Sequence, residues 1–240
     1  MWTALKRAIK TIVYSIVPPP YVPASYSQAG EAAVLRFLFA DKQMQKIAYL
    51  DLGTNAPDFG NNTYLFYRSG SRGVCVEADK TLIPTIEKIR PGDKILNVGI
   101  STTGQSVADF YIFDVKGIST FDRAEADKRA ASGKYKLTET VKVNLVDINT
   151  MIRTNFDRYP DLLSIDIEGL DLAVLRSLDF ETYPIPVVCA ETCSYSENHV
   201  RPKNVGIAEL MRSKGYEVYA DTYINTIFVR RTWFYDGASS

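Results

Sequence analysis

Short apolar runs typical of buried strands alternate with helical stretches along most of this chain, and this alternation limits the folds open to it. The expected strands span residues 47–52 (IAYLDL), 73–78, 94–99, 162–167 and 186–191. The expected helices span residues 29–40, 61–68, 82–89, 170–178 and 207–214. Strands that alternate with helices form a parallel, doubly wound sheet with helices on both faces. The sequence therefore predicts an α/β, Rossmann-like fold.

Three segments depart from this alternation. Residues 107–113 and 141–146 have the pattern of additional strands. Residues 121–134 are polar and predict a long loop. The wider segment 119–136 is a candidate to close over a bound acceptor, and the alternative is a disordered surface loop. The runs 217–220 and 224–230, separated by a turn, predict an antiparallel strand pair at the C-terminal end of the sheet.

Residues 1–20 are expected to form a segment of their own ahead of one domain over residues 21–240, since single domains run to about 250 residues. One helical face carries apolar side chains at spacings of three and four, namely Trp2, Leu5, Ile9, Ile12, Val13 and Ile16. This pattern predicts an amphipathic helix that packs on the domain or on a second subunit in a homo-oligomer. The alternatives are peripheral membrane contact through the basic residues 1–17, or a signal peptide, for which no cleavage site precedes the prolines.

Charge and cysteine content exclude some partners and compartments. The chain has 28 basic and 28 acidic residues, so it has no overall basic field to attract nucleic acid. Its three cysteines form no disulfide framework, which favours reduced thiols and a cytoplasmic location. Cys189, Cys193 and His199 lack a convincing fourth ligand for zinc. No run reaches the roughly 18 apolar residues of a membrane span.

Acidic side chains follow three of the expected strands. The segments are Asp51-Leu52-Gly53, Glu77-Ala78-Asp79 and Asp166-Ile167-Glu168-Gly169. Ligands of doubly wound sheets bind beyond the carboxyl ends of the strands. There Gly53 permits a tight turn close to a ligand, and Glu77 can accept hydrogen bonds from ribose hydroxyls. The alternatives are that Asp51 caps a helix and that Glu77 is a solvated strand end.

The turn after the first strand has no phosphate-binding glycine pattern. It reads GTNAPDFGN instead of G-x-G-x-x-G. An acidic, proline-containing loop suits a cationic, phosphate-free nucleoside better than a pyrophosphate. S-adenosylmethionine has this chemistry, and the missing glycines count against an NAD-binding oxidoreductase, the competing enzyme on this fold.

These stretches together resemble the FkbM family of methyltransferases. The resemblance lies in residues 27–31 (SQAGE), 50–53 (LDLG) with 61–64 (NNTY), 73–77 (GVCVE) and 163–169 (LSIDIEG). It departs at Ala32, where an Asp commonly follows the Glu. The resemblance implies a class I methyltransferase fold, S-adenosylmethionine as cofactor, and methylation of an oxygen, often on a sugar or natural product. A catalytically inactive methyltransferase-like binding module is the non-enzymatic alternative.

The resemblance also implies roles for individual positions. Asp51 and Gly53 would form the amino-acid end of the cofactor site, and Asp166 would face the sulfonium and the acceptor hydroxyl. The remaining assigned cofactor-binding residues are Asn55, Glu77 for the ribose, Ala78 and Asp79 beside the adenine, and Asn97 near its rim.

Methylation of a hydroxyl requires that its proton be removed. The candidate bases are Asp166, Glu168, Glu191 and His199. His199 titrates nearest neutral pH, but it lies in a polar segment where a histidine is commonly solvated. The three acids are alternatively candidates to hold a divalent cation that acidifies the hydroxyl. We expect a small-molecule or glycan acceptor. The candidates to line its pocket are Tyr64, Tyr67, Tyr111, Tyr195 and Tyr223, and the alternative for each is an ordinary place in the core or at its rim.

Overall fold

The computed structural model describes residues 25–115, 117–167, 169–193 and 203–236. The expected helix over residues 1–20 and its proposed membrane contact through residues 1–17 lie outside these ranges, as do Glu168, Tyr195 and His199. No helix among the described residues is long and apolar enough to span a lipid bilayer.

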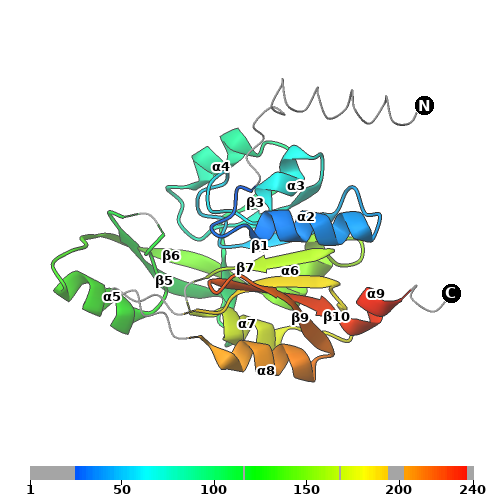
Figure 1. Cartoon of the computed structure of the whole chain (residues 1–240). Coiled ribbons are helices and arrows are strands. Elements are labelled where there is room, and N and C mark those ends of the chain that lie inside the picture. The colour runs from blue at the N-terminus through cyan, green and yellow to red at the C-terminus, as the bar shows by residue number, and fades with distance from the viewer. Residues whose placement is uncertain (1–24, 116, 168, 194–202, 237–240) are drawn as a thin grey trace, which may run out of the picture.

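A seven-stranded, mostly parallel sheet forms the centre of the molecule (Figure 1), in the order β3-β2-β1-β7-β8-β10-β9. The parallel strands are β1 (Ala48–Leu52), β2 (Arg72–Val76), β3 (Lys94–Leu96), β7 (Leu162–Ile165) and β8 (Val187–Glu191). Strand β10 (Asn225–Arg230) runs antiparallel to β8 and to the edge strand β9 (Tyr216–Asp221). This topology confirms the predicted class I methyltransferase fold with its C-terminal antiparallel pair.

Helices cover both faces of this sheet (Figure 1) because side chains of successive residues in a strand point to opposite faces. On β1, Leu50 and Leu52 pack toward one face and Tyr49 toward the other. The first face meets α6 (Ile148–Asn155), α7 (Asp171–Ser177) and α8 (Val205–Ser213). The second face meets α2 (Glu31–Asp41), α3 (Tyr64–Arg68), α4 (Ile83–Ile89) and α9 (Arg231–Tyr235).

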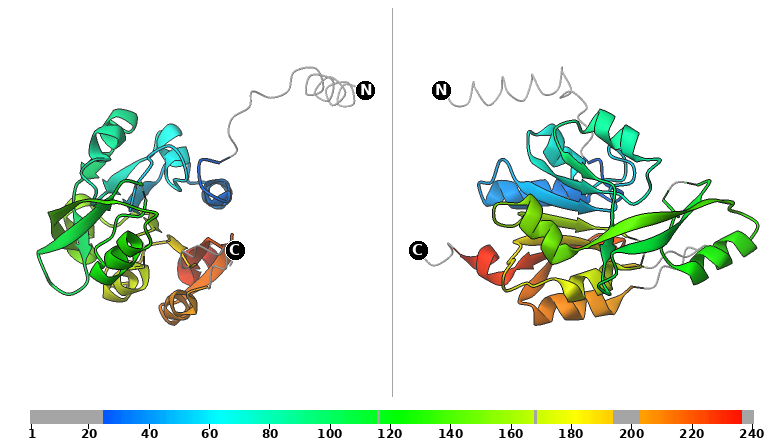
Figure 2. Two further views of the ribbon diagram at one scale, coloured as in Figure 1. Left: turned by 90° about the vertical axis from the view of Figure 1, so that its left-hand side faces the viewer. Right: turned by 180° about the vertical axis from the view of Figure 1, so that it is seen from behind.

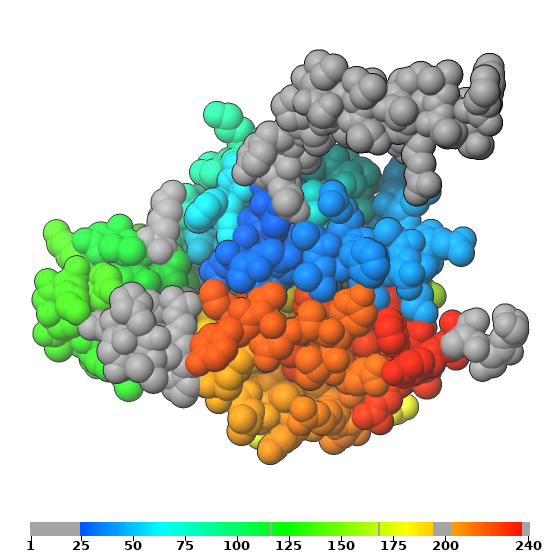
Figure 3. All heavy atoms as spheres, viewed as in Figure 1, coloured from blue at the N-terminus to red at the C-terminus, as the bar shows by residue number. Residues whose placement is uncertain are grey.

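The start of α2 is tied to the turn between β9 and β10, two segments far apart in the sequence. The buried Glu31 carboxylate accepts hydrogen bonds from Thr222 Oγ1 at 2.6 Å and Asn225 Nδ2 at 3.0 Å. Its second oxygen accepts the backbone N–H of Ala29 at 2.9 Å. In Figure 3 the blue α2 accordingly lies directly against the orange C-terminal strands. Glu31 therefore joins the N-terminal and C-terminal parts of the domain.

A second, three-stranded sheet projects from the domain (Figure 2) and replaces part of the predicted pattern. It contains β4 (Gly99–Ser101), β6 (Leu137–Asp147) and β5 (Val107–Phe113), with β6 in the centre. The expected strand 94–99 is divided between β3 and β4. The division occurs at Asn97, whose side-chain amide donates to the carbonyls of Glu77 and Ala78 beyond the end of β2.

The prediction of a long loop over residues 121–134 was wrong, because helix α5 (Arg123–Ala131) lies within it. The helix lacks an apolar stripe and buries only Ala126 and Arg129. It is stabilised locally instead. Asp122 caps its first turn by accepting the Glu125 N–H at 3.1 Å, and Glu125 pairs with Arg129 one turn later.

Candidate active site

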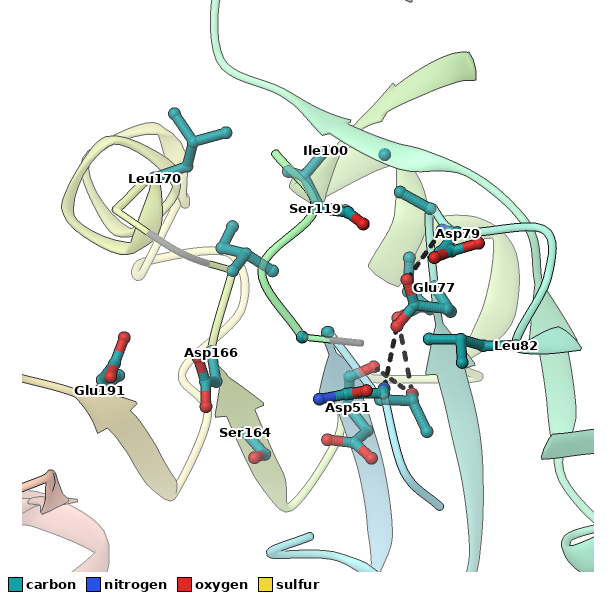
Figure 4. A pocket seen from close by; sticks show the side chains of 18 of the residues that line it. Asp51, Glu77, Asp79, Leu82, Ile100, Ser119, Ser164, Asp166, Leu170 and Glu191 are labelled. Carbon is teal, nitrogen blue, oxygen red and sulfur yellow. Dashed lines mark hydrogen bonds between the residues drawn. The ribbon is translucent and has the colours of Figure 1, made fainter. Parts of the chain in front are cut away.

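A cavity of about 500 Å³ lies where the carboxyl ends of β1, β2, β7 and β8 meet, as the strand order predicts. Figure 4 shows the acids at these strand ends, with Glu77 and Asp79 on one side, Asp51 in the middle, and Asp166 and Glu191 on the other. Most of the predicted site residues that the structure describes line this cavity: Asp51, Gly53, Asn55, Glu77, Ala78, Asp79, Asp166 and Glu191.

Gly53 sits where the end of β1 touches the end of β7. Its φ is +81°, and a Cβ at this position would lie 1.9 Å from the backbone oxygen of Asp166. Only glycine fits both the left-handed conformation and this close approach. The backbone of Gly53 therefore reaches the cavity with no side chain in the way, as a bound ligand requires.

Glu77 organises the part of the cavity beyond the end of β2, where the sequence analysis expects a ribose. One carboxylate oxygen accepts the N–H of Asn55 at 2.9 Å, and the other accepts the N–H of Asp79 at 2.8 Å. Burial raises the pKa of Glu77, and backbone hydrogen bonds from Asp79, Asn55 and Ala78 offset only part of the increase. A carboxylate has about four acceptor positions, so Glu77 keeps acceptor capacity for a ligand hydroxyl.

Asn55, Asp79 and Asn97 shape the backbone around Glu77. Asn55 has a positive φ of 47°, which turns its N–H toward the Glu77 carboxylate. Asp79 binds the N–H and hydroxyl of Thr81, so its carboxylate also stabilises the turn before α4. Asn97 is not among the described residues that line the cavity, so it supports the site through the backbone contacts of its side chain.

Asp51 belongs to a buried ionic network as well as to the cavity wall. Its Oδ2 accepts hydrogen bonds from Asn61 Nδ2 and Thr63 Oγ1, both at 2.9 Å, and lies 3.3 Å from a guanidinium nitrogen of Arg90. Arg90 is fully buried and also pairs with Asp93 at 2.8 Å. The sequence analysis did not single out this arginine, which lies in an Arg-Pro-Gly-Asp segment.

The opposite side of the cavity is formed by β7, β8 and two loops. Asp166 and Glu191 come from adjacent strand ends, near Ser164 (Figure 4), and the buried Asn62 donates to Ser164 from the same cavity wall. The aromatic residues that line the cavity are phenylalanines: Phe59, Phe110 and Phe121. None of the four expected tyrosines that the structure describes is among the lining residues, because Tyr64 and Tyr67 stack on each other and Tyr111 packs near α5.

The cavity wall is rich in hydrogen-bond acceptors. Of the lining residues that the structure describes, six carry carboxylates and none carries a lysine, arginine or histidine side chain. The acids are Asp51, Glu77, Asp79, Asp122, Asp166 and Glu191. Such a wall favours a neutral ligand rich in hydroxyl groups or a cationic ligand over an anion.

Two of the four candidate bases, Asp166 and Glu191, are brought together at the cavity. Glu168 and His199 lie outside the described residues. Within the described part of the chain, no three histidine, cysteine or acidic side chains are grouped closely enough to hold a metal ion, so the alternative of a divalent cation held by the acids has no support there. Cys75 and Cys189 are buried free thiols, and Cys193 is also buried.

The sheet order and the cavity at the acidic strand ends define a Rossmann-like α/β protein with a ligand site at the edge of its sheet. Comparisons with known proteins identify its family. A search of curated protein sequences gives no match. Among solved structures, the chain is similar to magnesium protoporphyrin IX methyltransferase from Synechocystis with bound S-adenosylmethionine. That match has 8% identity and a TM-score of 0.42, and it covers 83% of this chain and 77% of that one.

Two further structures have similar scores. A TehB-like S-adenosylmethionine-dependent methyltransferase from Corynebacterium glutamicum has 9% identity and a TM-score of 0.41, covering 95% of this chain and 98% of that one. An O-methyltransferase from Bacillus cereus has 13% identity and a TM-score of 0.38, covering 92% and 96%. The family is shown by sequence, because the methyltransferase FkbM domain model matches residues 51–218. The chain therefore belongs to the FkbM family of S-adenosylmethionine-dependent methyltransferases.

Proposed function

We propose that this protein transfers a methyl group from S-adenosylmethionine to a hydroxyl group of a sugar or glycan. The observation that carries the proposal is that Gly53, Glu77 and Asp166 line the same cavity. Gly53 offers its backbone to a ligand, Glu77 offers a carboxylate to the ribose hydroxyls, and Asp166 offers an acid to the reacting groups.

The residues present fit the proposed methyl donor. Glu77 would hold the ribose, and the backbone at Gly53 would lie against the amino-acid end. Ala78, Asp79 and Leu82 line the part of the cavity next to Glu77 and would surround the adenine. The donor supplies a methyl group already activated by a sulfonium, so the protein has mainly to align the reactants.

Asp166 and Glu191 are the described carboxylates best placed to act as base. The acceptor hydroxyl loses its proton to a carboxylate as its oxygen bonds to the methyl carbon. The electron pair of the broken carbon–sulfur bond stays on sulfur, which becomes a neutral thioether. Both acids come from rigid strand ends, so they can orient the hydroxyl in line with the bond that breaks.

The shape and chemistry of the acceptor side support a carbohydrate. Phe59 lines the cavity although its side chain is 81% exposed, so its ring stands at the mouth as a flat apolar surface. Asp122, Ser119 and Asn62 add polar groups around the same space. Sugar rings present apolar faces to aromatic rings and hydroxyls to polar side chains, which matches this combination.

Calorimetric titration tests the donor half of the proposal. We expect S-adenosylhomocysteine to bind and NAD not to bind, since no phosphate-binding glycine loop follows β1. Mass spectrometry of glycans incubated with the protein and the donor tests the acceptor half, through replacement of one hydroxyl hydrogen by a methyl group. An NAD-binding chain, or one that binds neither ligand, would refute the proposal.

A further inference from the structure

One buried polar atom at the cavity has no hydrogen-bond partner among the residues that the structure describes. The side chain of Asn62 is only 7% exposed and lines the cavity, and its Nδ2 donates to Ser164 Oγ at 3.3 Å. Its Oδ1 makes no hydrogen bond with any part of the chain that the structure describes. A buried carbonyl oxygen without a donor is unfavourable, so an atom in this state at a cavity wall indicates a ligand group.

The residues on either side hold Asn62 in place. Asn61 and Thr63 both donate to Asp51 Oδ2, and Asn61 Oδ1 accepts the backbone N–H groups of Thr63 and Tyr64. These bonds anchor the start of α3 to the end of β1. The backbone at Asn62 therefore has little freedom to bring Oδ1 to another donor within the chain.

The surroundings of Asn62 specify the chemistry of the missing partner. Ser164, which binds the Asn62 amide, lies on β7 two residues before Asp166, and the carboxylates of Asp166 and Glu191 line the same cavity. A carbonyl oxygen beside carboxylates calls for a hydrogen-bond donor that carries positive charge. An ammonium group meets both requirements.

The strand order indicates which ammonium group this is. Strands β2, β1 and β7 are adjacent, so Glu77, Gly53 and Asp166 follow one another across the sheet edge. Neighbouring strands lie about 4.8 Å apart, so a nucleoside anchored by its ribose at Glu77 reaches β7 after about 10 Å. The end of S-adenosylmethionine opposite its adenine is an amino acid with an ammonium group.

We propose that Asn62 Oδ1 accepts a hydrogen bond from the ammonium group of the methyl donor, beside Asp166. Asn62 is then a residue that selects and positions the amino-acid end of the donor. This assignment rests on the proposed function. It adds Asn62 to the donor-binding residues, a role that the resemblance to the FkbM family did not imply.

Two probes separate this contact from the rest of the site. S-adenosylhomocysteine carries the amino-acid end, whereas 5′-methylthioadenosine has the same nucleoside and thioether without it. By calorimetry, we expect Asn62→Ala to weaken S-adenosylhomocysteine binding by about 10-fold or more, the usual effect of losing a hydrogen bond to a charged group. Its affinity for 5′-methylthioadenosine should change by less than about 2-fold, since the probe has no group that reaches Asn62.

Two further variants complete the experiment. Asn155→Ala removes the same type of side chain from α6, where its amide binds the Met151 carbonyl away from the cavity, and should leave both affinities unchanged. Asn62→Asp keeps an acceptor oxygen and should bind S-adenosylhomocysteine at least as well as the wild type. If Asn62→Ala does not fold, the affinity of Asn62→Asp for S-adenosylhomocysteine tests the Asn62 contact instead.

The outcomes distinguish failure of this inference from failure of the proposed function. A wild-type protein that binds neither probe refutes the proposed function and this inference with it. Equal losses for both probes in Asn62→Ala, or no loss for either, refute the Asn62 contact and leave the proposed function standing. A selective loss of S-adenosylhomocysteine binding in Asn62→Asp would show that the amide donates instead of accepting, and would also overturn the contact.

Discussion

Replacement of Arg90 by methionine tests whether the buried ionic network supports the active site. Arg90 is fully buried, and it pairs with Asp51 at 3.3 Å and Asp93 at 2.8 Å. Methionine keeps most of the length of the side chain but removes the charge. The change therefore leaves two carboxylates in the interior without their cation.

The structure sets the size of the expected loss. Removing one partner of a buried ion pair costs about 3–5 kcal/mol. We expect the lower end, about 3 kcal/mol, because Asp51 keeps two hydrogen-bond donors, from Asn61 and Thr63. Asp93 likewise keeps the Tyr49 hydroxyl. For a protein of this size the loss corresponds to a fall of about 6–12 °C in melting temperature.

Thermal unfolding followed by circular dichroism measures this loss, and Arg123→Met is the matched control. Arg123 pairs with Asp127 on the surface, where both side chains are more than half exposed. An exposed pair of this kind contributes little to stability, so the control should melt within about 2 °C of the wild type.

A double mutant separates the ionic network from simple packing. Because Asp51→Asn removes one of the charges that Arg90→Met leaves unpaired, the combined loss should be smaller than the sum of the two single losses by about 1 kcal/mol or more. Strict additivity, or a melting temperature for Arg90→Met within 2 °C of the wild type as in the control, would contradict the network described here.

Four further predictions concern the cavity itself. Gly53→Ala should abolish S-adenosylhomocysteine binding, because its Cβ would overlap the Asp166 backbone oxygen 1.9 Å away; a variant that binds normally would show that β1 and β7 separate freely. Glu77→Ala should weaken that binding by about 100-fold through two lost hydrogen bonds. In the wild type, affinity should fall as pH drops through the pKa of Glu77, which burial raises above 4.5, because the protonated group loses acceptor capacity; Glu77→Gln should remove this dependence. Phe59→Ala should raise KM for a glycan acceptor about 10-fold and leave donor affinity unchanged, whereas an equal effect on the donor would place Phe59 elsewhere in the site.

Glu77 changes the stability of the folded protein with pH in the opposite direction from a salt-bridged acid. Its pKa is higher in the folded protein than in the unfolded chain, so the folded state favours the protonated form. The resulting stabilisation is present below the unfolded pKa and is lost as pH rises through the folded pKa. At neutral pH, ionisation of Glu77 thus lowers the stability of the folded protein. Such shifted pKa values are common among residues of binding sites.

Local patterns in the sequence were enough to predict the order of strands and helices. They also predicted which acids lie at the strand ends. An apolar run bounded by glycine predicts a buried strand wherever it lies, and Asp51, Glu77 and Asp166 follow such runs directly. The family was recognisable for the same reason, because its motifs are contiguous. Helix α5 was not found by apolar periodicity, since its stability comes from a cap and from surface ion pairs.

Only the tertiary structure decided which side chains share the cavity and which support it. Arg90 reaches Asp51 across 39 positions of the sequence, and Asn62 reaches Ser164 across 102. No local pattern predicts such pairs, because they depend on the order in which strands are placed in the sheet. The missing partner of Asn62 Oδ1 is likewise visible only after every other donor near it has been assigned, since burial and hydrogen bonding are properties of the packed chain.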